Sequence, residues 1–181
     1  MTIASKRRNA GGGATLAVLV LLPLISEVQG ADLLHRYPFT TTASDEIGSA
    51  HGTLVNGASI QNESVLLDGV SQYVDLPNDL VSNLDSITIE VWVMDEGSAG
   101  WARIFDFGNS TAGEDFPLGI GSQGLEYMFL STPSGPGTLR GAHTVSGGGG
   151  GEQLLEWPGT PLPVGQWKHV VWSVDGGAGN G

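Results

Sequence analysis

Strict alternation of apolar and polar side chains constrains this chain more than any other feature of its sequence. The clearest run is "SITIEVWVM", residues 86–94, where every second residue from Ile87 to Val93 is apolar. Successive side chains of a strand point to opposite faces, so these four share one face. The run therefore predicts a long β-strand with one side in the core. Sustained helical periodicity is absent from the sequence after residue 30.

Shorter runs with the same period recur and are separated by Gly, Pro, Asn and Asp. They cover residues 33–39, 53–55, 65–67, 73–76, 103–107, 118–121, 125–131 and 167–174. Many short strands punctuated by turn residues predict an all-β fold of two packed antiparallel sheets. Residues 132–162 are rich in Gly, Pro and Ser and include "SGGGGGE", which predicts a mobile loop there.

The first thirty residues have the layout of a secretory leader. Three basic residues, Lys6, Arg7 and Arg8, precede the apolar run 14–25, and "VQG" before Ala31 supplies small residues for cleavage. The apolar run is short for a bilayer span. We predict a cleaved signal peptide at 1–30 and one domain at 31–181, with an uncleaved N-terminal anchor as the alternative. The predicted location is secreted or at the cell surface, without membrane insertion after cleavage.

The net charge limits the classes of ligand that the chain can bind, and its cysteine content limits how the fold can be stabilised. Its 181 residues carry a net charge of −12, which disfavours binding to nucleic acid phosphates. An acidic surface of this kind can hold a hard cation such as calcium, although a solvated acidic surface is the commoner reading. The sequence has no cysteine, so no disulfide supports the predicted exported domain.

The last residues contain a strong strand followed by turn chemistry. "WKHVVWSV", residues 167–174, precedes "DGGAGNG", residues 175–181, whose Gly, Asn and Asp content is typical of a hairpin turn. Without a return strand, residues 167–174 would form an exposed edge. We therefore expect the sequence to be a C-terminally truncated form of a longer domain.

Six segments, in this order, resemble the laminin G-like modules of the concanavalin A-like lectin and glucanase superfamily. They are "LLHRYPF", "HGTLVNGAS", "VLLDGVSQYVDLP", "SITIEVWV", "WARIFDFG" and "LPVGQWKHVVWSVDG". The resemblance extends from about Leu33 to the C-terminus and implies a jelly-roll β-sandwich. It also implies a hairpin at "DGVSQYVDLP", turning at Asp68-Gly69, with Tyr73 and Val74 in the packing, and a central core strand at "TIEVWV".

Glucanases occur in the same superfamily, so a glycoside hydrolase is an alternative to a binding module. Retaining enzymes need carboxyl groups about 5–5.5 Å apart, which on a strand requires alternate positions. The nearest candidates, Glu90, Asp95 and Glu96, are five and one residues apart. No nucleophile elbow or His-Glu-x-x-His motif occurs, and the packed strand histidine is the favoured reading of His169. We therefore predict a non-catalytic protein.

A binding role needs an aromatic face for a sugar ring and polar side chains around it. Trp101 and Trp157 lie near Gly-rich or Pro-rich segments and are the predicted ligand-binding residues, although packing is an open alternative for Trp101. The other three tryptophans lie in predicted strands and are expected in the core; they are Trp92, Trp167 and Trp172.

Calcium is the candidate ion for the loops around residues 106–116. "DFGN" and "GEDF" bring Asp106, Asn109, Glu114 and Asp115 into one loop system, and calcium sites are built from such oxygen donors. A plain acidic loop is the alternative. An ion between neighbouring strands at Asp68 and Asp75 is equally open.

Together these features predict a secreted, non-catalytic laminin G-like module that binds glycan or protein outside the cell, with calcium as a candidate cofactor. One alternative is a structural or adhesion module of a larger surface protein without a ligand of its own. A fragment of a glycoside hydrolase, with its acids elsewhere, is the other. Because a fold hosts many functions, the glycan ligand rests on analogy with the resembled modules.

Overall fold

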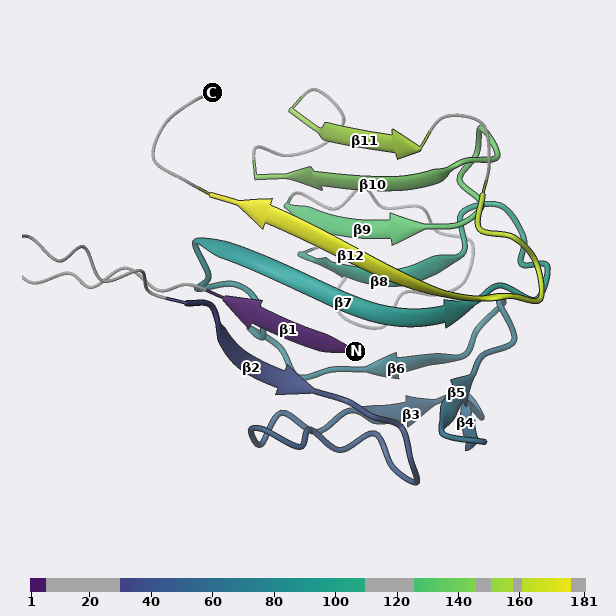
Figure 1. Cartoon of the computed structure of the whole chain (residues 1–181), viewed down its shortest axis with the longest axis horizontal. Helices are drawn as coiled ribbons and strands as arrows, with labels where there is room; N and C mark the ends of the chain where they lie inside the picture. The colour runs from purple at the N-terminus through teal and green to yellow at the C-terminus, as the bar shows by residue number, and fades with distance from the viewer. Residues whose placement is uncertain (6–29, 110–125, 146–150, 158–160, 177–181) are drawn as a thin grey trace, which may run out of the picture.

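Two four-stranded antiparallel sheets dominate the computed structural model, which describes residues 1–5, 30–109, 126–145, 151–157 and 161–176 (Figure 1). The first sheet has the strand order β12-β7-β1-β2 and the second β11-β10-β9-β8; two two-stranded sheets, β3–β6 and β4–β5, flank them. The strands are β1 (Thr2–Ser5), β2 (Asp32–Arg36), β3 (Thr53–Val55), β4 (Ser59–Gln61), β5 (Ser64–Leu66), β6 (Tyr73–Asp75), β7 (Ser86–Met94), β8 (Arg103–Gly108), β9 (Tyr127–Ser131), β10 (Leu139–Thr144), β11 (Gln153–Trp157) and β12 (Trp167–Asp175). The predicted all-β sandwich is confirmed.

The core lies between the two large sheets. Its buried residues are Ile3 from β1, Ile87 and Ile89 from β7, Trp172 from β12, Phe105 from β8 and Leu130 from β9. Both sheets thus contribute side chains to one apolar cluster, as expected for face-to-face packing. None of the described segments forms an apolar helix of the length needed to cross a bilayer.

The longest strand pair of the first sheet is β7 and β12. They are paired antiparallel along their full length, from Trp167 opposite Met94 to Asp175 opposite Ser86. Among the described strands, β12 has β7 as its only neighbour, so it lies at the edge of this sheet. The side chains of β7 that face inward are the isoleucines predicted to do so.

The segment 132–162, for which no strand was predicted from sequence, contains two paired strands. β10 and β11 run antiparallel, and β10 also pairs with β9. Small residues explain why these strands were missed: an ideal Cβ on Gly141 would lie 1.7 Å from Cζ3 of Trp172, so the Trp172 ring occupies the place of a side chain there. Glycine in this strand permits close packing of the two sheets. The glycine tract 146–150 lies outside the described residues.

The predicted hairpin at residues 68–77 is wrong in its pairing. Strand β5 pairs with β4, whereas β6 pairs with β3, so the two strands flanking the turn are not partners. The turn itself exists, with Gly69 at a φ of 67°. Oδ1 of Asp68 accepts the N–H groups of Gln72, Ser71 and Val70, and these hydrogen bonds lower its pKa to about 2. Asp68 thus organises the connection between β5 and β6.

Strand β1 comes from the segment predicted to be a signal peptide. Thr2–Ser5 lies between β2 and β7 and pairs antiparallel with both. Ile3 is fully buried in the core. Cleavage after Gly30 remains a prediction, and in the uncleaved chain these N-terminal residues complete the first sheet.

Candidate functional site

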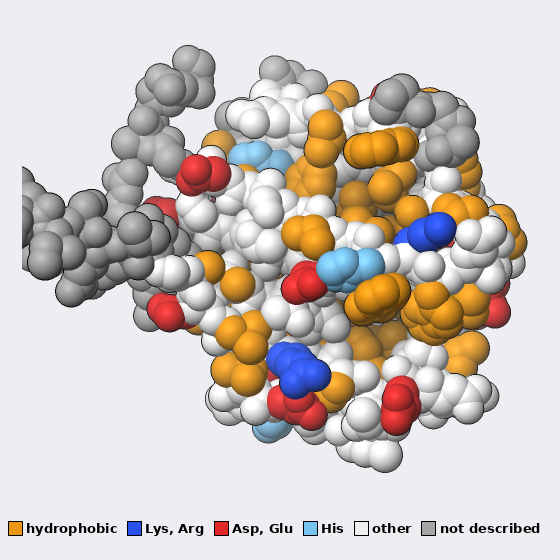
Figure 2. Space-filling model, viewed as in Figure 1, with side chains coloured by type: hydrophobic (Ala, Val, Ile, Leu, Met, Phe, Trp, Pro, Cys, Tyr) orange, Lys and Arg blue, Asp and Glu red, His pale blue; other side chains and the backbone are white. Residues whose placement is uncertain are grey.

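An exposed aromatic surface lies on the outer face of the first sheet. Because Ile89 and Trp172 point into the core, their neighbours in β7 and β12 point to the opposite side. This outer surface, which we call the β7–β12 platform, consists of Glu90, Trp92, Trp167, His169 and Val171. In the space-filling view, hydrophobic, acidic and histidine side chains gather over β7 and β12 (Figure 2).

Cross-strand contacts order the centre of the platform. His169 lies opposite Trp92 in the ladder, and the two rings stack with centroids 4.9 Å apart and planes at 25°. Nε2 of His169 lies 2.6 Å from Oε1 of Glu90. Stacking and this hydrogen bond together restrict both rings, so the platform is preorganised.

The exposure of the platform is unusual for such large apolar side chains. Trp92 is 65% exposed, Val171 55% and Trp167 50%. A contiguous apolar patch rimmed by polar side chains commonly marks a binding surface. Here an indole ring, an imidazole and a carboxylate lie side by side, which suits a ligand that has both flat apolar faces and hydroxyl groups.

Two core predictions fail at the platform. Trp92 and Trp167 were predicted to be core residues and are instead exposed, whereas Trp172 is buried as predicted. His169 shares a face with Trp167 and Val171 as expected, but that face points away from the core. Period-two alternation shows which residues share a face, and the choice of the inner face depends on the opposing sheet.

Trp101, a predicted ligand-binding residue, is partly wedged into the second sheet. The backbone N–H of Trp101 donates to the carbonyl of Pro133 at 2.7 Å, and the indole ring of Trp101 lies against Gly135. The guanidinium groups of Arg103 and Arg140 lie 5.6 and 5.3 Å from the ring centroid. Because Trp101 is still 44% exposed, packing and ligand contact are compatible at this position.

Trp157, the second predicted ligand-binding residue, ends the edge strand β11 and is 67% exposed. Its neighbour Glu156 forms an ion pair with Arg140, whose guanidinium faces Trp101. Alternation along β11 therefore directs Trp157 to the opposite face of the sheet from Trp101. The structure does not bring these two tryptophans together into one site.

The predicted calcium ligands are only half described, because Glu114 and Asp115 lie outside the described residues. Asp106 forms a salt bridge with Nε of Arg103 at 2.9 Å, and the amide oxygen of Asn109 accepts the N–H of Glu126 at 2.9 Å. Desolvation raises the pKa of Asp106, although Arg103 opposes this shift. Both side chains thus already have protein partners in this structure. Over the described residues, no group of three or more acidic or histidine side chains is suited to a metal.

Two of the three carboxyl groups considered for hydrolysis, Glu90 and Asp95, have separate hydrogen-bond partners. Glu90 is exposed and bonded to His169. Asp95 is buried, and its Oδ1 accepts the N–H groups of Gly97 and Ser98 and the hydroxyl of Ser98. Desolvation opposes ionisation of Asp95, but these hydrogen bonds prevail and lower its pKa. A carboxyl group that caps a turn in this way is not available as an acid or base.

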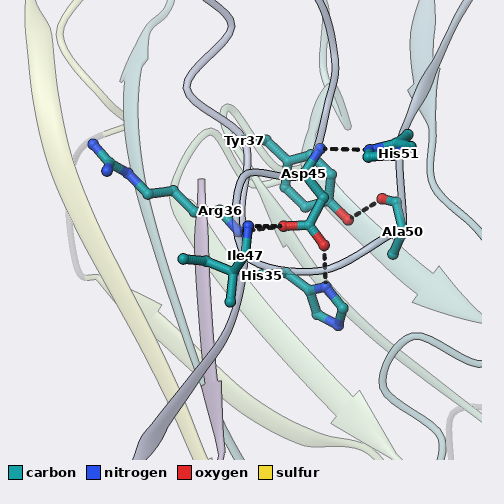
Figure 3. Close-up of polar contacts among 7 residues, drawn as sticks. All are labelled: His35, Arg36, Tyr37, Asp45, Ile47, Ala50 and His51. Atoms are coloured by element: carbon teal, nitrogen blue, oxygen red, sulfur yellow. Dashed lines mark hydrogen bonds and ion pairs between the residues drawn. The ribbon is translucent and has the colours of Figure 1, made fainter.

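A second polar cluster, around Asp45, was missed by sequence reasoning (Figure 3). The Asp45 carboxylate lies 2.7 Å from Nδ1 of His35 and accepts the N–H groups of Arg36 and Ile47 at 3.0 and 3.1 Å. Its own N–H donates to Nδ1 of His51 at 3.2 Å. These contacts fasten residues 43–52 to strand β2.

The electrostatics of this cluster favour an ionised, structural carboxylate. Desolvation would raise the pKa of Asp45, but the hydrogen bonds from His35 and from backbone N–H groups outweigh it and hold the pKa well below its usual range. Burial and the Asp45 charge raise the pKa of Tyr37 to about 12, and the Tyr37 hydroxyl donates to the carbonyl of Ala50 at 2.7 Å. The cluster therefore holds residues 43–52 against strand β2 and does not have the character of a catalytic dyad.

Comparison with known proteins gives one family match. The family model described as "Concanavalin A-like lectin/glucanases superfamily", of the laminin G type, matches residues 68–180. Neither the curated proteins nor the solved structures include a match. The matched range contains all of β7, β12 and the second sheet, and hence the whole platform.

Proposed function

Because the chain belongs to the concanavalin A-like lectin/glucanases superfamily, we propose that it is a secreted, non-catalytic binding module for a neutral glycan. Laminin G-like domains bind glycans or proteins and are usually extracellular. The leader-like sequence at 1–30 supports secretion. The separate structural roles of Glu90 and Asp95 support a non-catalytic module.

The β7–β12 platform is the observation that carries this proposal. Its exposed Trp92 offers an apolar surface to the C–H groups of a sugar ring, while the carboxylate of Glu90 lies beside it as a hydroxyl acceptor. The stack between Trp92 and His169 holds the indole in place before a ligand arrives, which lowers the entropy cost of binding.

Charge selects the class of glycan. The chain carries a net charge of −12, and the platform itself includes the carboxylate of Glu90. Sulfated or sialylated glycans would be repelled by this field at moderate ionic strength. A neutral polysaccharide or oligosaccharide is therefore the proposed ligand.

We expect Trp92→Ala in the full chain to weaken glycan binding about 30-fold, because truncating a central tryptophan typically costs about 2 kcal/mol or more. The measurement is binding to an array of immobilised neutral and sulfated polysaccharides, followed by titration of the best neutral binder. Val70→Ala, an exposed apolar residue in the 68–72 turn and outside strands β7 and β12, is the control and should bind like the wild type.

The array also tests the residues predicted from sequence. Trp101→Ala and Trp157→Ala are measured in parallel, and loss of binding in either of them with Trp92→Ala unaffected would move the site away from the platform. Preference for sulfated glycans would contradict the charge argument.

Protein binding is the second candidate function, favoured by strand β11. All five of its residues are exposed, including Leu154, Leu155 and Trp157. An exposed apolar edge strand is a common site for protein partners. Absence of binding to every glycan on the array would favour this adhesion or scaffolding role.

Calcium is proposed separately, at the four predicted ligands Asp106, Asn109, Glu114 and Asp115, where the ion would compete with the protein partners of Asp106 and Asn109. If the ion binds, calcium should raise the melting midpoint of the full chain, and Glu114→Gln should remove that shift. Glu63→Gln, an exposed carboxyl group outside this loop, serves as the control. An unchanged midpoint with calcium and with chelator would exclude a stabilising calcium site.

A further inference from the structure

The centre of the first sheet is filled by residues that the predicted cleavage would remove. Strand β1 pairs with β2 on one side and with β7 on the other, and Ile3 and Ser5 are almost completely buried. If residues 1–30 are cleaved, the backbone groups of β2 and β7 that face β1 lose their partners inside a sheet. Buried backbone N–H and C=O groups left in this way are costly, so the place must be filled or closed.

Closure by direct pairing of β2 with β7 is unfavourable. Each is antiparallel to β1, so the two are parallel to each other. Closing the place would require β2 to move by one strand spacing, about 4.8 Å, and to build a parallel ladder. It would also displace Tyr37 and the Asp45 cluster, which follow directly from β2.

Strand β1 itself fits its place imperfectly. The hydroxyl of Ser5 is buried, with no hydrogen-bond partner in the described part of the chain. A small hollow lies beside Ser5, next to Ile87 and Val174. The ladder with β2 shifts between Ile3 and Ala4. An apolar side chain in place of Ser5 would fill the hollow and remove the unsatisfied hydroxyl.

We propose that the position between β2 and β7 is an exchangeable strand-binding groove, which accepts an antiparallel strand from another polypeptide when Met1–Ser5 leaves. The incoming strand carries an aliphatic residue at the position of Ile3 and a small aliphatic residue, such as valine, at that of Ser5. At the position of Thr2, which lies opposite Arg36 and Glu90, a polar side chain is accepted. Main-chain hydrogen bonds supply affinity and the two inward positions supply specificity.

Peptide exchange on the full chain tests this proposal. A protease site is introduced between residues 6 and 29, the chain is cut, and the released N-terminal peptide is removed and its loss verified by mass. A fluorescent peptide Met-Thr-Ile-Ala-Val is then added. The cut chain should capture it, raising its anisotropy and the melting midpoint, whereas the uncut chain should not. A matched peptide with aspartate in place of the isoleucine should bind at least tenfold more weakly, because it would bury a charge.

Two results would overturn the proposal. One is a cut, folded chain that has lost its N-terminal peptide and captures neither peptide, which would mean that the sheet has closed. The other is equal capture of both peptides. Neither result bears on the glycan proposal, which the Trp92 variant tests in the uncut chain.

A second measurement covers the case in which the cut chain unfolds. In the uncut chain, Ser5→Val should raise the melting midpoint by about 2–4 °C if the groove favours an apolar residue there. Thr2→Val, on the outer face of the same strand, is the matched control and should change it by less. A lower midpoint for Ser5→Val would also overturn the proposed preference of the groove.

Discussion

Gly141→Ala should destabilise the protein by about 3 kcal/mol, the upper part of the range for overpacked cores. An ideal Cβ at Gly141 would lie 1.7 Å from Cζ3, 2.3 Å from Cη2 and 2.6 Å from Cε3 of Trp172. Contacts this short cannot be relieved by a small rotation, because Trp172 is itself packed between the sheets with Ile89 and Leu130. The two sheets must therefore separate locally or the indole must leave its rotamer.

Urea unfolding followed by circular dichroism measures this effect. Gly100→Ala is the matched control, because nothing lies within 4 Å of the Cβ that it adds and its φ is not in the left-handed region. The double variant Gly141→Ala with Trp172→Leu should be destabilised by less than the sum of the two single variants, since the smaller leucine leaves room for the new methyl group. Additive effects, or a Gly141→Ala protein as stable as Gly100→Ala, would show that the indole does not occupy this place.

Gly141 also shows why part of the fold was not predictable from sequence. Glycine in the segment 132–162 lowers its strand propensity, so composition favoured a loop. In the structure, Gly141 is small because a side chain from the opposing sheet, more than thirty residues later in the chain, covers it. The need for a glycine at position 141 comes from packing between the two sheets, so it cannot be predicted from the sequence of one segment.

The strands with pronounced alternation were predictable. The bounds of β7 and β3 agree with the predicted runs 86–94 and 53–55, and β12 extends one residue beyond the predicted 167–174. These segments combine β-branched and aromatic residues with period two, so local propensity and burial favour the same structure. Strand β1 has only four residues and lies in a leader-like segment, so no strand was predicted there.

For the candidate site, the sequence predicted the type of residue, tryptophan, but not which tryptophans form it. Sequence reasoning selected tryptophans for the site, but it placed Trp92 in the core, where its strand position and size suggested burial. Glu90 and its neighbours in β7 alternate with isoleucine and valine, which is a signal that Trp92 belongs to the outer set. The pairing of His169 with Trp92 depends on the register between β7 and β12, which lie about eighty residues apart.

The Asp45 cluster was beyond prediction for a different reason. His35, Asp45 and His51 span seventeen residues that contain no regular periodicity, and their contacts depend on the path of the loop. Short polar residues in loops commonly hydrogen-bond to nearby backbone groups, so their presence alone does not indicate a buried lock.

Asp45→Asn should cost about 3 kcal/mol of stability at neutral pH. The carboxylate is buried and accepts hydrogen bonds from His35 and from the N–H groups of Arg36 and Ile47. An asparagine keeps one acceptor oxygen and turns an NH2 group toward donors, which leaves buried polar groups unsatisfied. Loosening of residues 43–52 should follow and can be observed as faster amide hydrogen exchange.

The pH dependence of the stability difference between wild type and Asp45→Asn shows whether Asp45 stabilises the loop through its charge or through neutral hydrogen bonds. The pKa of Asp45 in the folded protein is below its ordinary value of about 3.9, so the ionised group stabilises the fold fully above that pH. Stability is lost as pH falls below about 4 toward the lower folded pKa, because the unfolded chain then binds the proton first. In Asp45→Asn this contribution is missing at every pH. The difference in unfolding free energy between wild type and variant should therefore stay constant from pH 7 to about 5 and shrink below about pH 4.

Glu46→Gln, which breaks only an exposed ion pair with Arg36, is the control in the same loop and should change stability by less than about 1 kcal/mol. A difference that persists undiminished at low pH would mean that Asp45 acts through shape rather than charge.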